Sequence, residues 1–205
     1  MCTAIGHGGA AYNPGMPKFD VCVRGAGVVG SCLALALSRQ GLSVALQHGT
    51  PASVTPAPPD VRAYALNAGS MALLRELKVW DALPADACTP VYDMRIEGDA
   101  EGASLEFSAW SQGVEALAWI VDTAELERAL ATALSFAPHV QRVPGPQTSV
   151  DAALLALAEG KASSTRERLG VAMPVVRYGQ RAVAARLVSD QAHGGVARQW
   201  FRSPD

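Results

Sequence analysis

The spacing of three glycines near the N-terminus constrains this chain more than any other feature. Within residues 19–48, an apolar run, a turn with Gly25, Gly27 and Gly30, an amphipathic stretch and a second apolar run follow one another. Gly25 permits a tight turn, Gly27 lets a phosphate group approach the backbone, and Gly30 lets a helix pack closely on the first strand. This order predicts a dinucleotide-binding βαβ unit, in which the free N–H groups of the helix face the phosphates.

The second predicted strand ends in Gln47 and His48, where a dinucleotide-binding unit usually carries Asp or Glu. The usual carboxylate accepts hydrogen bonds from the adenosine ribose. Both side chains can bond a ribose hydroxyl, but neither supplies an anionic acceptor. Two interpretations of His48 therefore stay open, a contact to the ribose and a solvent-exposed loop position.

Composition excludes several classes of partner. With 205 residues the chain can bury one good core, and 49% apolar with 18% charged residues is ordinary for a globular protein. A formal net charge of −2 provides no electrostatic footprint for nucleic acid or for an anionic membrane. No apolar run reaches the length of a membrane-spanning helix, which argues against a transmembrane segment and leaves peripheral membrane contact open.

The cysteines and histidines indicate no metal site. The four cysteines are scattered and form no CxxC pair, so neither a disulfide framework nor a zinc site is predicted, and a reducing cytoplasm fits. The four histidines are too dispersed to form a ligand set. Residues 1–17 have neither a basic start nor an apolar stretch, so they predict a disordered leader rather than a signal peptide.

Hydrophobic periodicity predicts the remaining elements. Alternation over residues 91–97 and 105–109, around a glycine-containing turn, predicts an antiparallel hairpin in a sheet separate from the parallel one. Leucines spaced four residues apart after Asp122 predict a helix that begins with a capping box. Further expectations are a helix capped by Asn67 or Ser70, a buried strand over 152–158, a loop over 137–148, and strands over 175–188 and 196–201.

A second motif follows the apolar run at 152–158 directly. Residues 159–166 read Glu-Gly-Lys-Ala-Ser-Ser-Thr-Arg. By themselves they are typical of a helix N-terminus with a capping serine. Together with the glycine turn they resemble the Asp-Gly-x-x-Ser-x-x-Arg signature of the flavoprotein aromatic hydroxylases, FAD-dependent monooxygenases, with Glu159 in the place of the aspartate.

Four further segments resemble one branch of that family, the ubiquinone-biosynthesis hydroxylases. They are residues 60–80, 119–130, 178–185 and 192–201, and they follow family order over most of residues 18–201. The resemblance implies an FAD cofactor, NAD(P)H as co-substrate, and dioxygen-dependent hydroxylation of a small phenolic or quinone-precursor ring. It also implies the following cofactor contacts, and no catalytic side chain: Gly25, Gly27, Gly30, His48, Arg62, Glu159 and Gly160.

The same resemblance implies a fold and its division. We predict an α/β protein with a Rossmann-like FAD/NAD(P)-binding domain on a parallel sheet and a partial antiparallel β lobe for the substrate. The FAD-binding domain is expected to comprise 18–90 and 118–173, and the lobe 91–117 and 174–205. Because the family's Gly-Asp motif would follow residue 205, we expect the N-terminal half of a hydroxylase, inactive by itself.

Two other functions stay open from the residues alone. One is a non-catalytic nucleotide-binding remnant, which the substitutions at His48 and Glu159 favour. The other is an NAD(P)-dependent dehydrogenase, which begins with the same βαβ unit. The hairpin argues against the dehydrogenase because it interrupts the alternating βα series such an enzyme would continue. The sequence predicts neither an oligomeric state nor which ring is the substrate.

Overall fold

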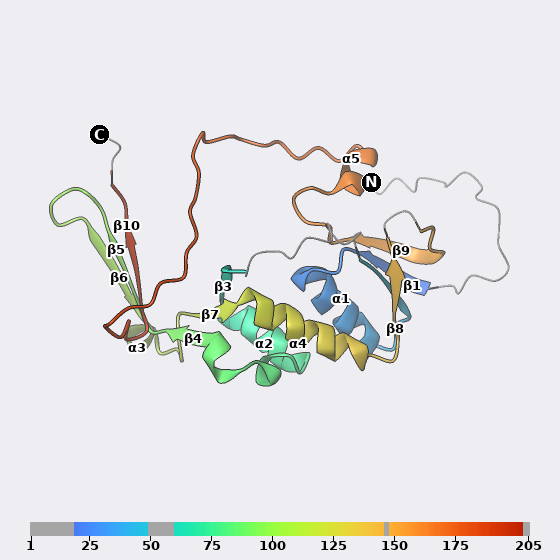
Figure 1. Cartoon of the computed structure of the whole chain (residues 1–205), viewed down its shortest axis with the longest axis horizontal. Helices are drawn as coiled ribbons and strands as arrows, with labels where there is room; N and C mark the ends of the chain where they lie inside the picture. The colour runs from blue at the N-terminus through green and yellow to red at the C-terminus, as the bar shows by residue number, and fades with distance from the viewer. Residues whose placement is uncertain (1–18, 49–59, 146–147, 203–205) are drawn as a thin grey trace.

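The computed structural model describes residues 19–48, 60–145 and 148–202 (Figure 1). The predicted leader, residues 1–17, lies outside the described residues. The described chain is elongated, with a parallel sheet at one end, a β-hairpin at the other and helices between them (Figure 1).

The parallel sheet confirms the predicted βαβ unit and positions the glycine turn. Its strands, in spatial order, are β8 (Val140–Pro144), β2 (Val44–His48), β1 (Phe19–Arg24) and β9 (Ala152–Leu157), and every neighbouring pair is parallel. Helix α1 (Val28–Arg39) connects β1 to β2. Because all four strands point the same way, their carboxyl ends meet at one edge of the sheet, beside the glycine turn.

The prediction of a loop over 137–148 is wrong, because β8 lies inside it and pairs with β2. Val143 is buried in this strand, whereas Gln141 and Arg142 are exposed, so the segment has no simple alternation that periodicity could reveal. Its strand conformation comes from hydrogen bonding to β2, a partner almost a hundred residues earlier in the chain.

Strand β9 is confirmed as a strand, but the prediction that it is buried is wrong. It lies at the edge of the sheet, and Leu154, Leu155 and Leu157 are 59%, 42% and 37% exposed. An apolar run of six residues is compatible with a strand at any place in a parallel sheet, so composition could not separate an edge from a centre.

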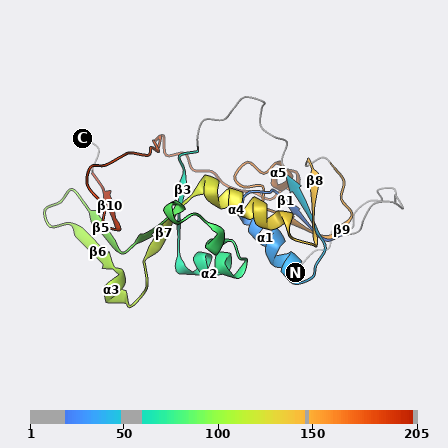
Figure 2. The same ribbon diagram turned by 60° about the horizontal axis from the view of Figure 1, so that its bottom comes forward.

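Helices α1 and α4 (Thr123–Ser135) pack side by side (Figures 1 and 2). The predicted stripe on α4 is confirmed, since Leu126 and Leu130 are almost fully buried and Leu134 nearly so. Asp122 caps this helix, its Oδ1 accepting from the N–H groups of Ala124 (2.8 Å) and Glu125 (3.2 Å). Burying this leucine stripe against α1 and the sheet forms the main core.

A second sheet and a short helix extend this core. The antiparallel sheet has the order β3 (Ala63–Leu66), β7 (Ala118–Asp122), β4 (Cys88–Val91). Of the two predicted caps for α2 (Ala68–Glu76), the structure selects Asn67, whose Oδ1 accepts from the N–H of Ser70 at 2.8 Å. Two 3₁₀ turns, η1 (Trp80–Ala82) and η2 (Ala85–Ala87), connect α2 to β4.

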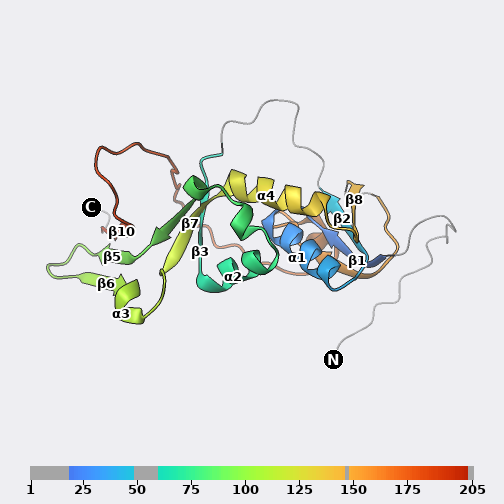
Figure 3. The same cartoon turned by 90° about the horizontal axis from the view of Figure 1, so that it is seen from below.

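The predicted hairpin is confirmed and belongs to a third sheet. Strands β5 (Asp93–Glu97) and β6 (Ser104–Ser108) are antiparallel, and the short helix α3 (Ala109–Gln112) follows them. Strand β10 (Val196–Trp200) joins the same sheet, parallel to β5. This sheet lies at the opposite end of the molecule from the parallel sheet (Figures 1 and 3). The division into an FAD-binding domain and a lobe stays a prediction.

The strand predicted over 175–188 is wrong. Within the described part of the chain, no strand lies between α5 (Ser164–Arg168) and β10. Val176, Val183 and Val188 are largely exposed in this extended connection. Alternation satisfies only the side-chain requirement of a strand, and a strand also needs a neighbour for its backbone groups, which this segment does not have in the described chain.

Candidate functional site

The glycine turn is built so that α1 can approach β1 and β9. Gly25 has φ +108°, a conformation that favours glycine, and a Cβ there would lie 2.3 Å from the carbonyl oxygen of Ala158. A Cβ on Gly30 would lie 1.8 Å from the carbonyl oxygen of Gly25. Both glycines are therefore required by packing against backbone atoms.

Gly27 is different, because a Cβ there would meet no atom within 4 Å. It is the N-cap of α1, which has no side-chain cap hydrogen bond and no acidic residue in its first turn. The first N–H groups of a helix have no intrahelical acceptors, and the helix dipole makes this end positive. The N-terminus of α1 can therefore bind an anion in the open space beside Gly27.

Two hollows meet at this turn, and both are lined by Gly27 and His48. The first, which we call the α4 hollow, has a volume of about 340 Å³ and is also lined by Leu46, Glu127, Leu130 and Arg142. The second, the β9 hollow, has about 360 Å³ and is also lined by Arg24, Gly25, Gln47, Ala158, Glu159 and Gly160. Five of the seven predicted contacts thus line these hollows, and Gly30 supports the turn from below.

Gln47 is a structural residue of the sheet edge. Its side chain is 1% exposed, and its Oε1 accepts a 2.8 Å hydrogen bond from Nε of Arg24. Its Nε2 donates to the carbonyl oxygens of Gly145 (3.2 Å) and Thr148 (2.8 Å). The amide is therefore used internally, and of the two residues that end β2 only His48 lines both hollows.

Glu159 is held by the start of α5. Its carboxylate accepts from Ser163 Oγ at 2.5 Å and from Thr165 Oγ1 at 2.9 Å. Burial by itself would raise the pKa of Glu159, but these hydrogen bonds and the charge of Arg24 outweigh it and lower the pKa. Ser163 in turn accepts from the N–H of Arg166 at 3.1 Å, which confirms the predicted capping serine. Glu159 therefore stays ionised and couples the β9 hollow to α5.

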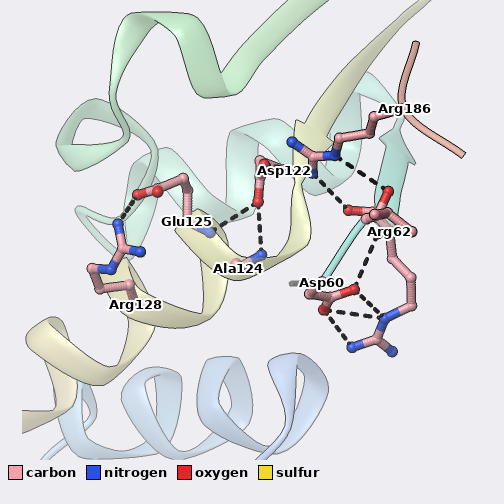
Figure 4. A network of polar contacts seen from close by, with 8 residues as sticks. Asp60, Arg62, Asp122, Ala124, Glu125, Arg128 and Arg186 are labelled. Atoms are coloured by element: carbon pink, nitrogen blue, oxygen red, sulfur yellow. Dashed lines mark hydrogen bonds and ion pairs between the residues drawn. The ribbon is translucent and has the colours of Figure 1, made fainter. Parts of the chain in front are cut away.

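Arg62 lines neither hollow. Its guanidinium pairs with both carboxylate oxygens of Asp60, at 2.7–3.2 Å, and the pair lowers the pKa of Asp60 to about 2 (Figure 4). The structure therefore does not bring Arg62 together with the other predicted contacts, and its flavin contact stays a prediction. Sequence reasoning also missed two charged residues of the α4 hollow, Glu127 and Arg142, which only the packing of α4 and β8 brings there.

A further ionic contact joins the long connection after α5 to the start of α4. Arg186 donates to Asp122 Oδ2 at 2.6 Å and to the carbonyl oxygen of Arg62 at 3.3 Å (Figure 4). Burial would raise the pKa of Asp122, but the bond from Arg186 and those from two backbone N–H groups lower it overall. Asp122 therefore acts both as a helix cap and as an anchor for a segment that has no strand partner.

Replacing Asp122 by asparagine should make the free energy of unfolding fall less steeply as the pH is lowered. Because folding lowers the pKa of this carboxyl from 3.8, its stabilisation is complete above that value and is lost as the pH falls through the lower folded pKa. The side chains of Asp122 and Arg186 are 18% and 51% exposed, so the expected contribution is below about 1 kcal/mol. Urea unfolding at pH 7 and pH 3 measures this contribution. Arg186→Met is the matched variant, because it removes the other partner of the ion pair. Equal pH slopes in wild type and Asp122→Asn would contradict this assignment.

A family comparison decides what this fold is. The model of the FAD-binding domain family matches residues 18–141, more than half of the chain. The chain belongs to this family. The matched range contains the glycine turn, the end of β2 and the whole of α4.

Curated relatives confirm the resemblance to ubiquinone-biosynthesis hydroxylases. The chain is 31% identical over 206 residues to 3-demethoxyubiquinol 3-hydroxylase of Escherichia coli K12, covering 91% of this chain and 52% of that protein. It is 28% identical to a ubiquinone hydroxylase of Rhodospirillum rubrum, covering 89% of this chain and 46% of the relative. The chain thus spans about half the length of the curated relatives it matches.

Solved structures agree with the fold. The p-nitrophenol 4-monooxygenase of Pseudomonas putida DLL-E4 aligns with a TM-score of 0.59 at 20% identity, over 76% of this chain and 44% of that one. Aklavinone-11 hydroxylase, solved with FAD and aklavinone, aligns with a TM-score of 0.54 at 23% identity, over 74% of this chain and 35% of that one. The predicted fold class is therefore confirmed.

The residues present fit the FAD of this domain family. Gly27 leaves open space before the uncapped end of α1, and the α4 hollow has apolar walls from Leu46, Leu130 and Leu134 beside polar groups. Arg24 adds a positive charge at the neighbouring β9 hollow. Among the described residues no cluster of His, Cys, Asp or Glu could hold a metal ion. None of the helices described has the length and apolar character needed to cross a bilayer.

Proposed function

We propose that this protein takes part in FAD-dependent hydroxylation of a phenolic or quinone-precursor ring, with NAD(P)H as reductant and dioxygen as the source of oxygen. The observation that carries the proposal is the glycine turn with its two hollows, in a chain 31% identical to a ubiquinol-precursor hydroxylase. The substrate class that this proposal implies is a small aromatic ring.

Each part of the site has a separate task in this proposal. Gly27 and the N–H groups of the first turn of α1 hold the pyrophosphate of FAD. The α4 hollow receives the adenosine end, because Leu46, Leu130 and Leu134 supply apolar contact for a flat ring. Arg24, His48, Glu159 and Gly160 line the path between the turn and α5. When bound, FAD itself supplies the redox chemistry.

A second candidate is a nucleotide-binding remnant without catalysis. His48 replaces the acid at the end of β2, and Glu159 is bonded internally by Ser163 and Thr165. Both features leave fewer groups for a dinucleotide than the family motifs provide. A reducing compartment such as the cytoplasm fits either candidate, because Cys22, Cys32 and Cys88 are unpaired thiols.

Titration of the purified chain with FAD separates the two candidates. We expect quenching of flavin fluorescence with saturation, and reduction of the bound flavin when NADH or NADPH is added under anaerobic conditions. Binding of FAD without reduction by either nicotinamide cofactor would favour the remnant. Failure to bind both FAD and ADP would overturn both candidates. Because the chain is expected to be inactive by itself, adding phenolic rings with NADPH and dioxygen should yield peroxide and no hydroxylated ring.

A further inference from the structure

The α4 hollow contains one carboxylate among the described residues that line it, and this carboxylate belongs to Glu127. Glu127 lies on the same stripe of α4 as Leu130, Ala131 and Leu134, which also line the hollow. The spacing of three, four and seven residues places all four side chains on one helix face. Glu127 therefore lies on the face of α4 that lines the hollow, which Gly27 and His48 also line.

Glu127 is exposed and has no partner among the described residues. Within the described chain it makes neither a hydrogen bond nor an ion pair, and it acts on the guanidinium of Arg62 only through its charge. Arg62 is already bound by Asp60 on both carboxylate oxygens. The other glutamate in this part of α4, Glu125, pairs with Arg128 (Figure 4). An unpaired carboxylate at a cavity wall is available for a ligand.

The end of β2 lacks the acid that a dinucleotide-binding unit usually has. Gln47 is buried and bonded internally, and His48 carries an imidazole where the ribose-binding carboxylate is usual. An adenosine ribose presents two vicinal hydroxyl donors, and one carboxylate can accept from both. A carboxylate on α4 that lines the hollow can therefore supply the anionic hydrogen-bond acceptor that the end of β2 lacks.

We infer that Glu127 is the ribose-binding acid of this domain, contributed by α4 in place of the residue at the end of β2. The inference rests on the proposed function, because it requires the adenosine end of FAD in the α4 hollow. It assigns selectivity as well: the hollow should prefer nucleotides with both free ribose hydroxyls over those that lack them.

Binding of ADP and of 2′,3′-dideoxy-ADP to the purified chain tests this by isothermal titration calorimetry. Glu127→Gln should weaken ADP about 10- to 100-fold, the range expected when hydrogen bonds to a charged group are lost. The same variant should bind dideoxy-ADP as wild type does, since that ligand lacks the hydroxyls. Glu125→Gln is the matched control, two residues away on the same helix and outside the hollow, and should bind both ligands normally.

The outcomes separate this inference from the proposed function. Equal ADP affinity in wild type and Glu127→Gln, or an equal loss for ADP and dideoxy-ADP, would overturn the role of Glu127 alone. A wild-type chain that binds neither ADP nor FAD would overturn the proposed function. Adding His48→Glu to Glu127→Gln returns a carboxylate to the end of β2, and recovery of ADP binding would support a shared ribose site. Circular dichroism of each variant checks that it is folded.

Discussion

Replacement of Gly27 by alanine is expected to abolish FAD binding while the fold stays intact. The backbone of Gly27 has φ −73° and ψ −174°, which alanine adopts readily, and its Cβ would meet no protein atom within 4 Å. That Cβ would instead occupy the space through which phosphate approaches the N–H groups of α1. Affinity should fall by at least about 100-fold, which corresponds to about 2.7 kcal/mol.

Flavin fluorescence titration measures this loss, and urea unfolding followed by circular dichroism measures the fold. The free energy of unfolding should stay within about 1 kcal/mol of wild type. The one expected cost is that alanine is a less favourable N-cap residue than glycine. An unchanged dissociation constant for FAD would show that the glycine turn serves packing alone. A large loss of stability would show that Gly27 is required by the fold.

Replacement of Gly30 by alanine should have the opposite effect and destabilise the domain. The new Cβ would lie 1.8 Å from the carbonyl oxygen of Gly25 and 3.2 Å from Cβ of Ala158. Since the nearer atom is backbone, α1 must move away from the turn and from the end of β9. Overpacking of this kind costs about 3 kcal/mol, or roughly a 10 °C fall in Tm for a domain of this size.

Thermal unfolding of Gly30→Ala beside Gly27→Ala provides the comparison, since both variants add one methyl group within one turn of helix. Loss of FAD affinity in Gly30→Ala should accompany its loss of stability. A melting temperature equal to that of wild type would mean that α1 approaches β1 less closely than the structure shows. The two variants together separate the role of the glycine turn in binding FAD from its role in packing α1 against the sheet.

The same division explains the end of β2. Gln47 and His48 are adjacent, yet the first is buried in a hydrogen-bond network and the second lines both hollows. Alternation along a strand sends neighbouring side chains to opposite faces, so only His48 reaches the α4 hollow, whereas both residues line the β9 hollow. A substitution at one of these positions therefore has a different consequence from the same substitution at the other.

The sequence by itself determined the elements whose causes are local. The spacing of Gly25, Gly27 and Gly30, the leucine stripe of α4 and the alternation around 98–102 predicted the turn, the helix and the hairpin, and all are confirmed. Each depends on residues within a few positions of one another. The second motif was also local, because Ser163 caps a helix that begins at the next residue.

Only the tertiary structure decided the features that depend on distant partners. Strand β8 exists because β2 lies beside it, and residues 175–188 form no strand because the described chain offers them no neighbour. The α4 hollow likewise forms where the turn, β2, α4 and β8 converge, so that Glu127 and His48 line the same space. Periodicity describes one segment at a time, whereas pairing and packing depend on which segments meet, and that choice is made by the whole chain.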